Sequence, residues 1–122
     1  MIKGIGVDTV QISRIEQSLS IPNFLESTFT QQEIANELGD KPTYYATRFA
    51  CKEAVFKAIG YPTDWRVVET LNDENGKPYV SNPEYKDLKV HISITTEAGL
   101  ATAFCVVETM CHVSRSDLPY PD

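Results

Sequence analysis

The segment Thr47–Gly60, TRFACKEAVFKAIG, decides the fold of this chain because it has the pattern of a long helix. Within it, Glu53 lies among apolar residues, and a second carboxylate, Asp8, follows the largely apolar stretch 1–7. Burying an unpaired carboxylate is costly, so each acid should meet a cation. That cation could be a lysine, an arginine or a metal ion, and the choice determines the function of the protein.

The composition is that of one globular domain. The chain has 122 residues, 42% hydrophobic and 23% charged, with a net charge of −6. We expect a single domain over 1–122 with a polar tail at about 112–122, and the negative charge argues against nucleic acid or an anionic membrane surface. No apolar run approaches the roughly 20 residues that span a bilayer, and no signal-peptide core begins the chain, so a cytoplasmic protein is expected.

The three cysteines are an odd number without paired spacing, which favours a reducing compartment. Cys51 and Cys105 fall in apolar patterns and are predicted to be small core residues. Cys111 beside His112 is poor evidence for a metal site, because adjacent ligands do not match the usual spacing.

The first half of the chain is predicted to hold one buried strand followed by helices. The capping box Thr30–Glu33 is the strongest local signal, and its helix should end at Gly39. Lys41-Pro42 should break the chain before the long helix, which Gly60 suits as a C-terminal cap. The predicted elements are a buried strand at 2–8, a helix at 12–19, a short helical turn after Pro22, a helix from 30 to about 38 and the long helix at 43–59.

The second half changes to β patterns. Asn75-Gly76 is a good hairpin dipeptide, Val90, Ile92 and Ile94 alternate with polar residues, and 100–108 is nearly all apolar, as in a central strand. The predicted strands are 66–71, 77–80, 88–95 and 100–108, separated by a turn at 72–76, a loop at 81–87 and a turn at 96–99. The fold class is therefore α+β, with an antiparallel sheet packed against the long helix and shorter N-terminal helices.

Two charged pairs lie on different sides of the long helix. At about 100° per residue, Glu53 and Lys57 are neighbours, whereas Arg48 and Lys52 point roughly 140° away. A surface helix should have one solvated face, so the pattern indicates that one pair faces water and the other a cleft. The alternative is that Glu53–Lys57 is an ordinary exposed pair worth about 0.3–0.5 kcal/mol.

The segment Arg48–Gly60 resembles the signature helix of the 4′-phosphopantetheinyl transferases, and Gly4–Asp8 resembles the first-strand motif of that superfamily. The turn Asn75–Pro78 and the strands around Ser93–Thr95 and Ala101–Phe104 agree in order, over about residues 2–108. The short chain is similar to the holo-acyl-carrier-protein synthase branch.

This resemblance implies transfer of the phosphopantetheine arm of coenzyme A to a serine of an acyl or peptidyl carrier protein, with release of adenosine 3′,5′-bisphosphate. Asp8, Glu53 and Lys57 would be the catalytic residues: the two acids would bind Mg²⁺, or Mn²⁺, and the lysine would contact phosphate. The resemblance also implies a homotrimer with sites between subunits. The further candidate coenzyme A contacts are Arg48, Gly76, Lys77, Pro78 and Thr96.

Two departures from the family pattern bear on mechanism and partner. Thr96 stands where the family commonly has a histidine, and a threonine cannot act as a base near neutral pH. His91, five positions earlier, does not replace it, so the base would be Asp8 or a water on the metal ion. In the helix at 12–19 the only basic residue is Arg14, the candidate carrier contact, where the branch is typically rich in basic residues.

The sparse charge at 12–19 suggests a less acidic carrier, from a dedicated secondary pathway; Arg14 could equally be an ordinary solvated residue. Two other functions remain open. One is a non-catalytic module that binds coenzyme A or carriers, and the other is an unrelated α+β interaction module in which Glu53–Lys57 is a plain surface pair.

Overall fold

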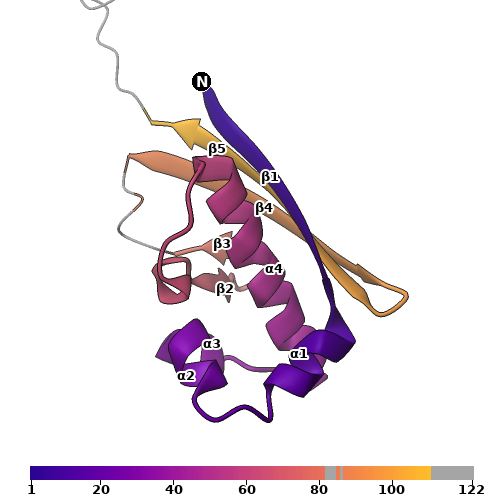
Figure 1. Ribbon diagram of the computed structural model, residues 1–122. Coiled ribbons are helices and arrows are strands. Elements are labelled where there is room, and N and C mark those ends of the chain that lie inside the picture. The colour runs from indigo at the N-terminus through magenta and orange to yellow at the C-terminus, as the bar shows by residue number, and fades with distance from the viewer. Residues whose placement is uncertain (82–84, 86, 111–122) are drawn as a thin grey trace, which may run out of the picture.

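The computed structural model describes residues 1–81, 85 and 87–110, and it confirms the α+β class (Figure 1). The predicted tail, with Cys111 and His112, lies outside the described residues. In chain order the elements are β1 (Ile2–Gln11), α1 (Ile12–Ser18), α2 (Phe24–Thr28), α3 (Gln31–Ala35), α4 (Lys41–Ile59), the 3-10 turn η1 (Trp65–Val67), β2 (Thr70–Asn72), β3 (Pro78–Val80), β4 (Leu88–Glu97) and β5 (Leu100–Thr109).

The helix α4 lies along one face of an antiparallel sheet with strand order β1-β5-β4 (Figure 1). β2 and β3 form a separate hairpin that also contacts α4 and β4. The central position predicted for 100–108 is confirmed, as is the placement of Cys51 and Cys105 in the core. Burial raises the pKa of both thiols to about 12, so they are inert at neutral pH.

The strand β1 reaches α4 through two glycines. A Cβ atom on Gly4 would lie 1.9 Å from the carbonyl oxygen of Ala58, and one on Gly6 would lie 2.0 Å from that of Ala54. Only glycine permits this approach, because any side chain would enter the helix backbone. Backbone therefore packs directly on backbone, two residues before Asp8.

The prediction of a fully buried first strand is wrong. β1 continues to Gln11, and Ile5 and Val7 are 62% and 52% exposed. These side chains point away from α4, because successive residues of a strand alternate between faces and α4 covers only one of them. The opposite face of the sheet carries apolar side chains that no described element covers.

Three other boundaries differ from the prediction. The segment 66–71 begins as η1, because the Asp64 side chain accepts a hydrogen bond from the Arg66 backbone at 2.9 Å, and the strand starts only at Thr70. α3 ends at Ala35 rather than near Leu38, where Asn36 caps the helix and its side chain donates to the Gln32 carbonyl oxygen.

The Lys41-Pro42 step opens α4 instead of breaking the chain. Asp40 caps the helix by accepting from the Thr43 backbone at 3.1 Å, and proline is tolerated in a first helical turn. The capping box at Thr30–Glu33 and the left-handed cap at Gly60, with φ of 96°, are confirmed. Within the described residues, no helix has the length and apolar character needed to cross a membrane.

The contact between β1 and α4 can be tested by Gly6→Ala. The added methyl must push the strand off the Ala54 carbonyl, and overpacking of this kind costs roughly 1–3 kcal/mol. We expect a fall in the melting temperature of roughly 5–10 °C, measured by circular dichroism. Lys3→Ala, an exposed change on the same strand, should leave it unchanged. An unaltered melting temperature for Gly6→Ala would contradict the close approach.

Candidate active site

Asp8, Glu53 and Lys57 come together between β1 and α4, as the sequence predicted. The Lys57 ammonium donates to Asp8 Oδ1 at 3.1 Å and to the Val7 carbonyl oxygen at 3.0 Å. The Asp8 side chain is only 16% exposed and that of Lys57 is 55% exposed. Lys57 thus forms an ion pair with Asp8 of β1. The alternative of a plain Glu53–Lys57 pair on the helix surface does not describe the structure.

The charge of Asp8 affects the ionisation of Glu53. Burial raises the pKa of Glu53, the negative charge of Asp8 raises it further, and Lys57 opposes both effects. One ammonium group therefore does not fully compensate two half-buried acids. A further positive charge placed between them would lower the pKa of Glu53 and stabilise its ionised form.

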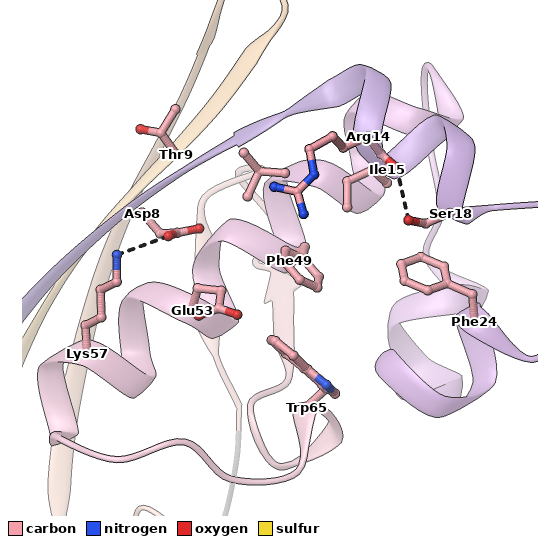
Figure 2. A pocket seen from close by; sticks show the side chains of 11 residues that line it. Asp8, Thr9, Arg14, Ile15, Ser18, Phe24, Phe49, Glu53, Lys57 and Trp65 are labelled. Atoms are coloured by element: carbon pink, nitrogen blue, oxygen red, sulfur yellow. Dashed lines mark hydrogen bonds and ion pairs between the residues drawn. The ribbon is translucent and has the colours of Figure 1, made fainter. Parts of the chain in front are cut away.

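A cavity of about 530 Å³ extends from these residues toward the N-terminal helices. Figure 2 shows Asp8, Glu53 and Lys57 at one end, and Arg14, Ser18 and Phe24 at the other. Between them Phe49 of α4 stacks on Trp65 of η1, with ring centroids 4.8 Å apart. The cavity thus joins a charged end to an aromatic wall.

The other charged pair of the long helix is Arg48 and Lys52, and neither side chain faces water. The prediction that one of the two pairs is solvated while the other faces a cleft is therefore wrong. Lys52 is fully buried and donates to Glu33 Oε1 at 2.7 Å and to the Val68 carbonyl oxygen. Burial lowers the pKa of Lys52, and the charge of Glu33 opposes that shift. Glu33 also accepts from the Thr30 and Thr70 backbones, so this network fixes α3 and β2 to α4.

Arg48 lies on the same buried side. Its guanidinium stacks on the Tyr44 ring, 4.4 Å from the centroid, and donates to Asn72 Oδ1 at 2.8 Å. The side chain is 7% exposed, and its Nε has no hydrogen-bond partner among the described residues. The phosphate-binding role predicted for Arg48 stays a prediction.

The other predicted coenzyme A contacts also lie away from the cavity. Gly76, Lys77 and Pro78 are in the β2–β3 hairpin, and Thr96 is exposed near the end of β4. β5 separates β4 from β1, so Thr96 is about 10 Å to the side of the strand that carries Asp8. In a single copy of the chain, the predicted coenzyme A contacts therefore do not all lie at one site.

Sequence reasoning missed the aromatic wall. Trp65 falls in a segment expected to be near a strand, and nothing in its spacing relates it to Phe49. The composition offered one signal, because Trp65 is the only tryptophan of the chain. Phe24, which also lines the cavity, falls in the short helical turn predicted after Pro22, and nothing in the sequence pattern relates that turn to the site.

The donor set is consistent with a hard divalent cation that keeps most of its waters. Asp8 and Glu53 supply carboxylate oxygens from a strand and a helix interior, both rigid mounts, and Mg²⁺ is usually held by one or two such groups plus substrate phosphates. The described residues contain no cluster of three or more histidine, cysteine, aspartate or glutamate side chains that could hold a metal ion alone. A cation here would need the oxygens of a bound phosphate.

Comparison with known proteins identifies the family of the chain. Residues 4–105 match the family model described as the 4′-phosphopantetheinyl transferase superfamily. A holo-[acyl-carrier-protein] synthase of Bacillus pumilus is 39% identical, covering 90% of this chain and 98% of that protein. The Bacillus anthracis synthase crystallised with CoA (3′,5′-ADP) has a TM-score of 0.80, 34% identity and coverage of 89% and 98%. The Helicobacter pylori synthase in complex with coenzyme A has a TM-score of 0.77, 29% identity and coverage of 85% and 99%.

The chain belongs to the 4′-phosphopantetheinyl transferase superfamily. It is therefore an enzyme, a transferase of the class that contains the holo-[acyl-carrier-protein] synthases.

Proposed function

We propose that Asp8 and Glu53 together bind a divalent cation, Mg²⁺ or Mn²⁺, in the reaction that this transferase catalyses. The protein moves the 4′-phosphopantetheine group from coenzyme A to an apo carrier protein. The observation that carries the proposal is the placement of Asp8 beside the half-buried Glu53, whose pKa burial and the Asp8 charge raise and Lys57 only partly lowers. The free, buried Cys51 and Cys105 fit a reducing compartment such as the cytoplasm.

In this reaction the serine oxygen of the carrier attacks the β-phosphorus of coenzyme A. The bond to the oxygen that bridges the two phosphorus atoms breaks, and adenosine 3′,5′-bisphosphate leaves. When bound, the cation supplies positive charge that stabilises the leaving phosphate.

The residues of this chain supply the remaining functions. Lys57 lies 3.1 Å from Asp8 and is the ammonium group that would donate to a phosphate oxygen. Asp8 is the candidate that takes the serine proton, because Thr96 cannot act as a base. The stacked Phe49 and Trp65 form a wall of the same cavity and exclude water from one side of the reacting groups.

We also propose that the enzyme is a homotrimer with its sites between subunits. The uncovered sheet face presents Ile5 and Val7, which are 62% and 52% exposed, and Phe104, which is 45% exposed. Val7 is the cross-strand partner of Phe104, so these side chains form a continuous apolar patch, a typical interaction surface. A groove lined by Ile5, Val7, Phe104 and Lys57 connects this face with the active site.

Assembly would also account for the scattered contacts. Thr96, the β2–β3 turn and Arg48 lie away from the cavity of their own chain. In the proposed trimer they would contact coenzyme A bound at the cavity of a neighbouring subunit. Closed rotational symmetry then repeats the same completed site at each interface.

The first test is a mass assay with coenzyme A, Mg²⁺ and apo carrier proteins. We expect the carrier to gain one phosphopantetheine group, and Asp8→Asn or Glu53→Gln to lower the rate at least about 100-fold. Glu53→Gln should not lower the melting temperature, because it removes a charge that burial and Asp8 disfavour. Glu26→Gln, which changes an exposed acid on α2, is the control.

Chelation of the metal should stop the reaction, and added Mg²⁺ should restore it. Tight coenzyme A binding without any mass gain would contradict catalysis and favour a binding module. Full activity of both carboxylate variants would contradict the proposed cation site.

The carrier preference follows from the charges near the cavity. Arg14 lines the cavity, while α1 also carries Glu16 and lacks further basic residues. A single rim charge mainly tunes encounter and specificity, so we expect faster modification of a weakly acidic carrier from a secondary pathway than of a fatty-acid carrier. Initial rates on the two purified carriers decide this, and a strong preference for the fatty-acid carrier would contradict it.

The trimer can be tested by Phe104→Glu. A carboxylate at the centre of the apolar patch should be desolvated on assembly, so we expect dissociation to monomers and a loss of activity. Light scattering after gel filtration measures the mass. Ser13→Glu, exposed on α1, should leave the mass unchanged. A wild-type protein that is monomeric at micromolar concentration would contradict the proposal.

A further inference from the structure

The cavity of about 530 Å³, the aromatic cavity, has a wall made by two elements of unequal size. Phe49 is part of the 19-residue helix α4, whereas Trp65 begins η1, a turn of three residues. In Figure 2 the Trp65 side chain extends from the loop after α4 toward Phe49. The width of the cavity beside Glu53 therefore depends on what holds η1 against α4.

A single charged hydrogen bond links the segment that carries Trp65 to α4. Within the described residues, the backbone-to-backbone hydrogen bonds of residues 61–68 stay inside that segment, and one of them, from Val68 to the Trp65 carbonyl oxygen at 3.4 Å, closes η1. Among the same residues, the hydrogen bond that joins the segment to α4 runs from the Lys52 ammonium to the Val68 carbonyl oxygen. Lys52 thus grips the chain three residues after Trp65.

Glu33 fixes the position of that ammonium group. Glu33 Oε1 accepts from Lys52 at 2.7 Å, and Glu33 Oε2 accepts from the Thr70 backbone at 3.0 Å. Lys52 and Glu33 are both fully buried. The chain from Val68 to Thr70 is therefore held at both ends by one ion pair, which leaves the Trp65 turn little freedom to move away from α4.

We propose that Lys52 is a positioning residue for the transfer reaction, an inference that rests on the proposed role of the Phe49–Trp65 wall beside the reacting groups. Lys52 does not line the aromatic cavity and is not exposed to a substrate. It acts through the Val68 carbonyl oxygen, which holds the Trp65 ring against Phe49 at the separation that a bound substrate needs.

Stability alone does not account for a lysine at this position. Replacing a buried ion pair by apolar side chains of similar volume often leaves stability unchanged or raises it. An apolar side chain packs without a fixed direction, whereas an ammonium group donates to several acceptors at set distances. Lys52 thus defines the distance between α4 and the chain that carries Trp65, which an apolar residue would not do.

The test is a neutral pair, Lys52→Met with Glu33→Gln in one protein. Methionine fills the space of the lysine stem, and glutamine keeps the capping box with Thr30, so no buried charge is left unpaired. We expect a melting temperature within roughly 5 °C of wild type, and a kcat/KM for coenzyme A at saturating carrier that falls roughly 10-fold. The matched control is Lys41→Met with Glu26→Gln, which makes the same changes at exposed positions and should alter neither quantity.

Trp65 is the only tryptophan of the chain, so its fluorescence reports the wall directly. In the neutral pair we expect emission at a longer wavelength and stronger quenching by acrylamide, because the ring leaves Phe49 and meets water. The measurement is made at a temperature where circular dichroism shows an intact fold. In a Trp65→Leu background, the neutral pair should lower kcat/KM by no more than a further factor of about two, because no ring remains to be misplaced.

Glu33→Gln alone separates positioning from stability. It removes the charge partner and lowers the melting temperature, but Lys52 still donates to the Val68 carbonyl oxygen, so kcat/KM should stay within about twofold of wild type. This variant also decides the matter if the neutral pair does not fold.

The proposal is overturned if the neutral pair is as active as wild type, if its Trp65 emission is unchanged, or if Glu33→Gln loses activity as fully as the neutral pair. In each of these cases the transfer reaction itself stands, because the comparison is with an active wild type. A wild-type protein that transfers no phosphopantetheine would overturn both.

Discussion

The packing of β1 on α4 places the reacting groups. Gly4 and Gly6 allow the strand backbone to touch the helix backbone at Ala58 and Ala54. Asp8 follows on the same face of the strand, and Glu53 and Lys57 lie on the adjoining side of the helix. Carboxylates from distant parts of the chain therefore share one cavity, because a contact without side chains sets the distance between their elements.

The opposite side of α4 is held by a second interaction. Lys52 and Glu33 are both fully buried, and their network ties α3 and β2 to the helix. Removing one member of a buried pair typically costs about 3–5 kcal/mol, because an uncompensated charge is left behind. Lys52 and Glu53 are adjacent in the chain, yet one lies within a structural network and the other lines the site. Helical geometry alone separates their roles.

The surfaces that remain uncovered indicate what the single chain lacks. The apolar sheet face continues into the groove beside Lys57, so the proposed assembly would bring a second copy next to the proposed site. Glu53 and Lys57 line both the aromatic cavity and a smaller hollow at the C-terminal end of α4.

The sequence by itself determined the α+β class, the long helix with its Gly60 cap and the capping box at Thr30, whereas the meeting of Asp8 with Glu53 and Lys57 was implied only by the family resemblance. The class, the helix and the caps follow from local periodicity, turn chemistry and motifs, which are properties of neighbouring residues. Only the tertiary structure decided that Lys52 and Arg48 are buried, that one face of β1 is exposed, and that Trp65 stacks on Phe49. Those outcomes depend on which elements pack against each face, and a helix or strand pattern does not state what covers it.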